Sequence, residues 1–326
     1  MPVQSSAIPL IVTDRAPGPT LAHWTVVARC PGCDASGHAT RALLPDTHYK
    51  FGKERILIPE QGISVIECGD CGLYYKGTVP APSFLKGIFE RQAASKWKAP
   101  TRPSVQAASL REWRAGGTCD LLDVGAAGGA LLGAFARRGV HGRRSALDVM
   151  RYPGIENHLA GEFIEGFIDD PLPAWSCDPY DLVTVFDVLE HLYRPRAAFE
   201  NLRLLVKPGG RLFIETGNPD SGWPRRYGIG EWWYVRLLEH HIFWSRRSLQ
   251  RIAADFGFRL VEWRTVRHKS RRRLVRAGLS ADLLKMGLYW AAPKYYSAIA
   301  NVFGKQGNQP WDPFARDHFQ ACLLRT

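Results

Sequence analysis

No uninterrupted apolar run in the 326-residue chain approaches the roughly 20 residues that a membrane span needs. The apolar segment AIPLIV near the N-terminus is too short and too lightly flanked for a signal peptide. Internal repeats and low-complexity tracts are also lacking, and apolar and charged residues make up an ordinary 45% and 23% of the chain. These absences argue against membrane-embedded, secreted and repetitive proteins. We therefore expect a cytoplasmic globular protein with one large domain and smaller additions.

Acidic residues are too few to balance the basic ones, and the formal net charge is +12. Residues 116–265 are nearly neutral, whereas residues 1–115 and 266–326 carry the excess of lysine and arginine. The densest basic segment is RHKSRRRLVR, at 267–276. Such a segment suits RNA, an anionic membrane surface or a phosphorylated substrate, or it is simply a solvated face.

Four of the seven cysteines form two pairs, Cys30 with Cys33 in CPGC and Cys68 with Cys71 in CGDC. Two such pairs can close a tetrahedral thiolate site around zinc. Disulfides would need an oxidising compartment, and a redox C-x-x-C motif would occur once, beside a βαβ unit. We predict a structural zinc ion with four protein ligands, for which His38 is a possible substitute ligand. The remaining cysteines are expected in the core: Cys119, Cys177 and Cys322.

From residue 119 onward, segments with strand patterns alternate with segments that have helical apolar spacing. This alternation predicts an α/β fold with a largely parallel sheet, helices on both faces, and ligands at the carboxyl ends of the strands. The predicted strands cover 119–124, 143–149, 180–186, 211–216, 258–263 and 318–324. The predicted helices cover 129–138, 195–206 and 245–257.

The segment LLDVGAAGG, at 121–129, joins the first predicted strand to a helix through residues with almost no side chain. Its glycines do not follow the G-x-G-x-x-G spacing of a dinucleotide site. Asp123 at its head would repel a pyrophosphate but can accept a hydrogen bond from an ammonium group. Asp148, at the end of the second strand, can accept two ribose hydroxyls. Both features suit S-adenosylmethionine, which carries an amino acid where a dinucleotide carries phosphates.

Five blocks in order make the chain resemble the class I S-adenosylmethionine-dependent methyltransferases: LLDVGAAGG, ALDV, YDLVTVFDVLEHL, LLVKPGGRLFIETGN and EHHIFWSRRSLQRIAADFGF. PFARDHFQACLL resembles the family's closing segment. The resemblance implies a Rossmann-like, seven-stranded sheet in which Asp148 holds the ribose. Asp169 would lie near the adenine amino group. Four residues would face the methionine part of the cofactor: Asp123, Gly125, Ala127 and Gly129. Phe167 and Ile168 would flank the adenine or belong to the core, and Phe186 and Asp187 would lie under the sulfonium.

Two acid–histidine pairs, Glu190–His191 and Glu239–His240, come after the predicted strands at 180–186 and 211–216, where the strand ends should meet. A histidine is the usual base when a hydroxyl or carbon acid must lose its proton. The zinc cysteines and the later Glu-His pair resemble the zinc-containing sugar C-methyltransferases of natural-product pathways, which implies that Glu239 and His240 are catalytic. The chain departs from that family because it ends soon after the methyltransferase segment and has Leu237 where a tyrosine is expected. Glu190 and His191 are catalytic or form a helix-capping or core pair.

The predicted organisation is a zinc-binding module at 1–80, a helical linker at 81–117 and a methyltransferase domain at 118–326. Within that domain, residues 221–245 are expected to form a substrate lid. Trp232, Trp233 and Tyr234 would stack on a flat substrate or pack internally. Residues 268–314 are expected to form a helical cover on the substrate side or a contact between two copies in a homodimer.

Two functions of different class follow. The first is methylation of a neutral or anionic small molecule at oxygen or carbon in a biosynthetic pathway. The second is methylation of an RNA base, because some ribosomal-RNA methyltransferases carry an N-terminal zinc ribbon. FDVLEH stands where an amino-methylating enzyme would have an Asn-Pro-Pro-Tyr motif, which favours the small molecule. A non-catalytic cofactor-binding partner is disfavoured by the intact acidic and glycine positions.

Overall fold

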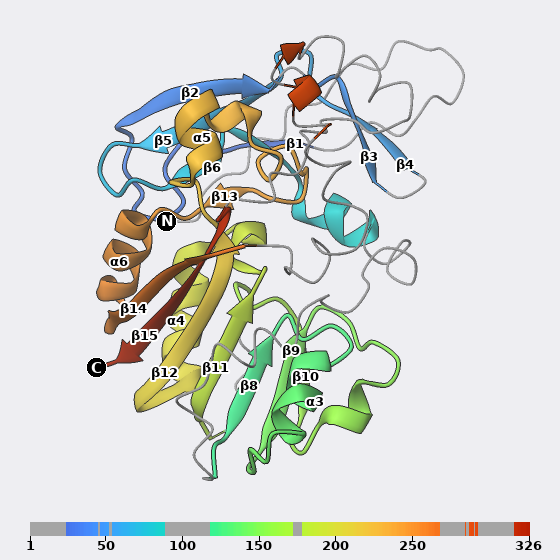
Figure 1. The fold of residues 1–326 in the computed structure, drawn as a ribbon, viewed down its shortest axis with the longest axis vertical. Helices are drawn as coiled ribbons and strands as arrows, with labels where there is room; N and C mark the ends of the chain where they lie inside the picture. The colour runs from blue at the N-terminus through green and yellow to red at the C-terminus, as the bar shows by residue number, and fades with distance from the viewer. Residues whose placement is uncertain are drawn as a thin grey trace.

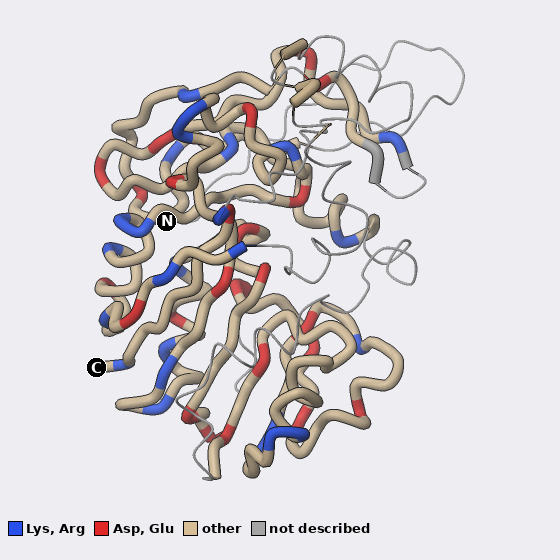
Figure 2. Tube along the Cα trace, in the orientation of Figure 1, with Lys and Arg blue, Asp and Glu red and all other residues tan. Residues whose placement is uncertain are grey.

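A computed structural model describes most of the chain (Figure 1). The described residues are 24–44, 46–51, 54–88, 118–171, 178–267, 284, 287–289, 291–292 and 316–326. Cys177, most of the expected helical cover and all but the first residue of the basic segment therefore lie outside them. Lysine and arginine, like aspartate and glutamate, are spread along the whole described trace (Figure 2). No helix among the described residues is long and apolar enough to cross a membrane.

A seven-stranded sheet carries the predicted α/β fold. Its order is β10-β9-β8-β11-β12-β15-β14, with parallel pairing except at β15, which runs antiparallel to both of its neighbours. The order reverses between β8 and β11, and this switch point is where open α/β sheets bind ligands. The strands are β8 (Leu121–Val124), β9 (Arg144–Asp148), β10 (Phe163–Glu165), β11 (Tyr180–Phe186), β12 (Val206–Gly217), β14 (Phe258–Val266) and β15 (His318–Arg325). The predicted class I methyltransferase sheet is confirmed.

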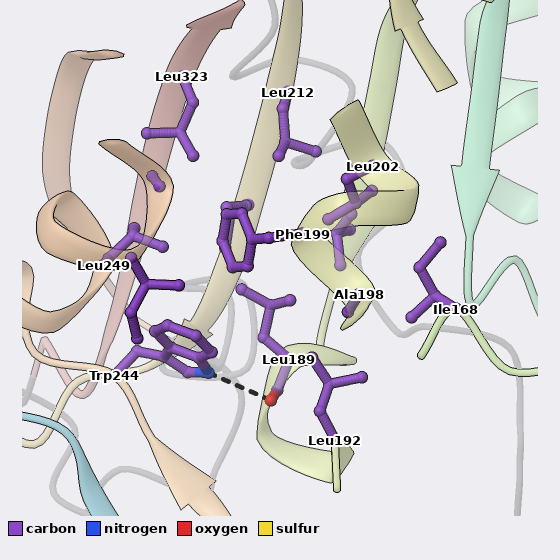
Figure 3. Close-up of a cluster of buried hydrophobic side chains, with 14 of the residues drawn as sticks. Ile168, Leu189, Leu192, Ala198, Phe199, Leu202, Leu212, Trp244, Leu249 and Leu323 are labelled. Carbon is purple, nitrogen blue, oxygen red and sulfur yellow. Dashed lines mark hydrogen bonds between the residues drawn. The ribbon is translucent and has the colours of Figure 1, made fainter. Parts of the chain in front are cut away.

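Helices cover both faces of this sheet because successive strand residues point to opposite sides. On one face α3 (Ala130–Ala136) packs on a cluster that includes Leu121 and Leu182. On the other face α4 (Pro195–Leu205) and α6 (Arg246–Asp255) pack on a cluster that includes Leu122 and Val183. Figure 3 shows part of this second cluster, where the indole of Trp244 donates to the carbonyl of Leu189.

A four-stranded antiparallel sheet forms most of the cysteine-bearing module. Its order is β13-β6-β5-β2, with β2 (His38–Leu44), β5 (Ile63–Cys68) and β6 (Tyr74–Lys76) close together in the sequence. The edge strand β13 (Ile242–Phe243) comes from the end of the expected lid, so the lid is tied into this sheet. Two short antiparallel pairs complete the module: β1 (Trp24–Val26) with β7 (Thr78–Pro80), and β3 (His48–Phe51) with β4 (Glu54–Leu57).

The expected lid forms α5 (Gly222–Tyr227) and the single turn η4 (Ile229–Glu231), followed by an aromatic segment. Trp232 and Tyr234 are buried in a cluster with residues of the cysteine-bearing module, such as Ile63 and Val65. They therefore pack internally and do not offer a stacking surface. Trp233 is partly exposed, and its indole donates to a carboxylate oxygen of Asp317.

Candidate functional site

The glycine-rich turn after β8 is pressed against the ends of two neighbouring strands. Its residues Gly125, Ala127 and Gly129 all have φ between 46° and 75°, which is the left-handed region. A Cβ on Gly125 would lie 2.3 Å from Cγ2 of Val188, just beyond β11, so only glycine fits there. At Gly128 a Cβ would meet nothing within 4 Å. The turn therefore packs tightly on one side and presents open backbone on the other, as a ligand cradle requires.

Two buried carboxylates lie at this turn. Asp123 accepts a hydrogen bond from the hydroxyl of Thr184 at 2.7 Å, and burial raises the pKa of Asp123 to about 7. Asp148 accepts a hydrogen bond from the amide of Ala127 at 2.7 Å, and burial also raises its pKa. The amides of Val149 and Met150 also favour the charged form of Asp148, and a carboxylate with about four acceptor sites still has room for a further donor. These groups fit S-adenosylmethionine, whose ammonium would satisfy the buried negative charge and whose ribose would donate to Asp148.

The segment after β10 gives its three predicted adenine residues different roles. Ile168 is buried in the cluster beneath α4, as the core interpretation expected. One oxygen of Asp169 accepts hydrogen bonds from the amides of Tyr193 and Arg194, both at 3.0 Å. Asp169 thus holds the chain just before α4, a role that the sequence did not indicate. Phe167 is partly exposed and remains the candidate for the adenine contact.

At the end of β11, Asp187 adopts a left-handed conformation, with φ of 53°. Its Oδ1 lies 3.7 Å from Nε2 of His318, a fully buried imidazole whose Nδ1 lies 3.2 Å from a carboxylate oxygen of Asp317. Burial alone would lower the pKa of His318, but these carboxylates raise it overall. The carboxylates of Asp187 and Asp317 therefore favour the charged form of His318, and the sequence did not predict this contact because Asp187 and His318 are far apart in the chain. Phe186, the last residue of β11, is partly exposed.

The two predicted histidines lie side by side. The rings of His191 and His240 meet edge to face, with centroids 4.8 Å apart. Nδ1 of His191 lies 2.8 Å from the carbonyl of Glu239, and Nδ1 of His240 lies 3.0 Å from the carbonyl of Tyr234. A carbonyl can only accept, so each Nδ1 carries the proton and each Nε2 keeps its lone pair.

The histidines differ in exposure. His191 is 25% exposed, whereas His240 is buried, and burial together with the charge of His191 lowers the pKa of His240 well below 6.5. The two members of the predicted Glu239–His240 pair each have a hydrogen-bond partner of their own. The Tyr234 carbonyl holds the imidazole of His240, while the Glu239 carboxylate is hydrogen-bonded to Tyr49 of the cysteine-bearing module.

Glu190 is buried between β12 and the expected lid. One of its oxygens accepts a hydrogen bond from Thr216 at 2.8 Å, and the other accepts one from Tyr234. The second oxygen also lies 4.0 Å from Nε2 of His191. Glu190 thus fixes the lid to β12 as a buried core residue and places a carboxylate beside the exposed imidazole, while its catalytic role stays a prediction.

The four paired cysteines gather at one point of the cysteine-bearing module. Their Sγ atoms all lie within 4.8 Å of one another, and Cys30–Cys71 and Cys33–Cys68 are each 3.5 Å apart. Four Zn–S bonds of about 2.3 Å in a tetrahedron place the sulfurs about 3.8 Å apart. The cluster therefore fits zinc, and it needs no contribution from His38, which is exposed on β2.

A methyltransferase domain family matches residues 85–263, which is more than half of the chain. The chain belongs to this methyltransferase family. The match runs from the segment before β8 to β14, and it includes the glycine-rich turn and both histidines. The S-adenosylmethionine-dependent class I methyltransferase fold is thus supported by both sequence and strand order.

Two curated relatives carry the same description, ubiquinone biosynthesis O-methyltransferase. The one from Acinetobacter baylyi is 32% identical over 193 residues, which cover 53% of this chain and 80% of the relative. The one from Xylella fastidiosa is 35% identical over 125 residues, which cover 36% of this chain and 50% of the relative. The chain thus spans only about half the length of some curated relatives that it matches.

Among solved structures, the chain is similar to 1,6-didemethyltoxoflavin-N1-methyltransferase from Burkholderia thailandensis. The identity is 13% and the TM-score 0.49, over 86% of this methyltransferase and 98% of that chain. That structure holds 1,6-didemethyltoxoflavin and S-adenosylhomocysteine.

Proposed function

We propose that this methyltransferase transfers a methyl group from S-adenosylmethionine to an acidic hydroxyl of a small molecule in a biosynthetic pathway. The observation that carries the proposal is the pair of adjoining imidazoles of His191 and His240, with both Nε2 lone pairs kept for accepting a proton. The curated relatives named as O-methyltransferases support oxygen as the acceptor atom.

The acidity of the acceptor follows from the strength of the base. An imidazole is in general too weak a base to deprotonate an aliphatic alcohol, but a phenol, with a pKa near 10, is within reach. A phenolic hydroxyl is therefore the acceptor class that we propose.

Each group at the site has a proposed role in this reaction. S-adenosylmethionine supplies a methyl group on sulfonium that is already activated for attack. Asp123 would bind the ammonium and Asp148 the ribose, while the backbone from Gly125 to Gly129 would face the methionine part. Phe167 would pack on the adenine.

The proton leaves the acceptor for Nε2 of His191, the more exposed imidazole. Glu190, 4.0 Å away, stabilises the imidazolium that forms. His240 stays neutral behind His191, and the carbonyl of Glu239 holds His191 through Nδ1. The O–CH3 bond forms as the S–CH3 bond breaks, and the products are the methyl ether, S-adenosylhomocysteine and the transferred proton.

Zinc has a structural role in this proposal. The four thiolates leave no coordination position for a substrate, so the ion would stabilise the module at 1–80 and would not take part in methyl transfer. Residues 118–326 would carry the chemistry, with the segment at 221–245 covering the acceptor.

The proposal is tested with the full chain, S-adenosylmethionine and a panel of acceptors, by measuring S-adenosylhomocysteine formation. The panel holds catechols and simple phenols, a 1,3-dicarbonyl carbon acid, a nucleoside-diphosphate sugar and ribosomal RNA. We expect turnover with a phenol, loss of turnover in His191→Ala, and normal turnover in His141→Ala, which alters an exposed histidine. Turnover of the RNA or the sugar alone would overturn the proposal.

A further inference from the structure

Lys76 is the last residue of β6, in the cysteine-bearing module, and its side chain is only 1% exposed. Lysine is rarely buried, because removing an ammonium group from water is unfavourable unless its partners compensate. Of the lysines and arginines whose burial the structure describes, this residue alone is buried. Its position therefore calls for a physical reason beyond the packing of the module.

Two hydrogen bonds connect Lys76 to the segment that carries Glu239 and His240. Its Nζ donates to the carbonyl of Leu237 at 2.6 Å, and its backbone amide donates to the carbonyl of His241 at 2.9 Å. Leu237 and His241 lie on either side of the acid–histidine pair. One residue thus fixes both ends of this short segment.

The same segment also contacts the short turn that follows β11, Leu189–His191. The amide of His241 donates to the carbonyl of Glu190 at 2.7 Å, and Nδ1 of His191 donates to the carbonyl of Glu239 at 2.8 Å. The segment therefore lies between Lys76 and His191. A displacement of the segment from Lys76 would move the acceptor that orients the exposed imidazole.

Lys76 also brings positive charge to this part of the site. Burial lowers its pKa to about 7, whereas the nearby carboxylates of Glu239 and Asp46 oppose that change. Below that pH the ammonium is charged, and its charge contributes to lowering the pKa of both His240 and His241.

Three further groups complete the surroundings of Lys76. Tyr49 donates to Glu239, and the charge of His191 also disfavours protonation of His240 and His241. His241 is fully buried, and although the backbone of His191 favours its charged form, burial and the neighbouring positive charges lower its pKa well below 6.5. The neutral forms of both imidazoles are therefore favoured around the ammonium.

We propose that Lys76 is a positioning residue of the methyl-transfer site, which holds the Glu239–His240 segment in place and places positive charge beside it. This inference rests on the proposed function of that site. The cysteine-bearing module thereby contributes to catalysis through a residue that lies five positions after Cys71.

The test compares Lys76→Met with Lys86→Met in the full, zinc-loaded chain. Methionine approximates the length of the lysine stem without its charge, and Lys86 is an exposed lysine near the same module. Histidine is labelled with 15N, the signal of His240 is assigned with His240→Gln, and imidazole protonation is followed by NMR as pH falls. This readout needs no methyl acceptor.

We expect His240 to become protonated at higher pH in Lys76→Met than in the wild-type protein, because a neighbouring positive charge has been removed. Lys86→Met should match the wild-type protein. With a phenol that is turned over, kcat should fall about 10- to 100-fold in Lys76→Met. The acidic limb of the pH profile of kcat should move to higher pH, while the affinity for S-adenosylhomocysteine is retained.

An unchanged protonation midpoint of His240 in Lys76→Met, or an equal change in Lys86→Met, would overturn the inference. If Lys76→Met does not fold, Lys76→Gln is measured in the same way, because it removes the charge while keeping a donor. Failure of every acceptor in the panel refutes the proposed function, but the NMR result still decides the role of Lys76.

Discussion

Replacing Asp123 by asparagine should make the cofactor-free protein more stable and its cofactor site weaker. Burial raises the pKa of Asp123 to about 7, the charge of Asp148 adds to this, and the hydrogen bond from Thr184 opposes it. In an unfolded chain an aspartate has a pKa of about 3.9. The folded protein therefore holds the proton more tightly, and the contribution of Asp123 to stability falls as pH rises from about 4 to about 7.

The pKa difference sets the size of the effect. A rise of about three pKa units corresponds to as much as about 4 kcal/mol of lost stability at pH 8. Asparagine keeps an oxygen for the Thr184 hydroxyl but cannot ionise. We expect the melting temperature of Asp123→Asn to exceed that of the wild-type protein at pH 8, with a smaller difference at pH 5. Affinity for S-adenosylhomocysteine should fall, because the ammonium group loses its charged partner.

Scanning calorimetry of the cofactor-free protein at both pH values and titration calorimetry with S-adenosylhomocysteine measure the two effects. Asp170→Asn is the control, because Asp170 is about half exposed and pairs with Arg194 on the surface. Surface pairs contribute little, so this variant should match the wild-type protein in both assays. Lower stability of Asp123→Asn at pH 8, or an unchanged affinity, would refute the reasoning.

The remaining predictions concern the ribose, the zinc ion and the base. Asp148→Ala should weaken S-adenosylhomocysteine binding by about 2–4 kcal/mol, because two charge-assisted hydrogen bonds are lost, and unchanged affinity in calorimetry would contradict this. Purified protein should hold about one zinc ion per chain by elemental analysis. Cys30→Ser or Cys68→Ser should lower thermal stability far more than cofactor affinity, whereas four titratable thiols in metal-free native protein would exclude the site. His191→Ala and His240→Ala should each reduce turnover roughly 10²- to 10⁴-fold, with the larger loss in His191→Ala. If both variants remain active, the reaction needs no base and depends only on the alignment of the acceptor with the methyl group.

The sequence predicted the sheet well, because its strands are apolar runs bounded by clear turn signals. The segment LLDVGAAGG was enough to predict the turn at the switch point and the position of Asp123 in it. The position of Asp148 followed from its place at the end of a predicted strand. The cysteine cluster followed from spacing alone. These features depend on residues close together in the chain, and local patterns record such features directly.

Features that depend on contacts between distant residues were missed. A two-residue strand such as β13 has no period to detect, and the burial of Lys76 depends on carbonyls more than 160 positions away. The sequence also paired Glu239 with its neighbour His240, although adjacent residues need not face each other. In the folded chain Glu239 is hydrogen-bonded to Tyr49, and the imidazole of His240 is hydrogen-bonded to the carbonyl of Tyr234.

The pairing of β13 with β6 bears on how this enzyme can be recombined with others. Tyr74 and Tyr75 are in register with Phe243 and Ile242, so one edge of the cysteine-bearing sheet is encoded well inside the methyltransferase segment. A chimera joined near residue 117 would combine a foreign β6 with the native β13 and would lose the partner of the Leu237 carbonyl. The exchangeable unit is therefore discontinuous, and a functional hybrid must inherit residues 237–245 together with the N-terminal module.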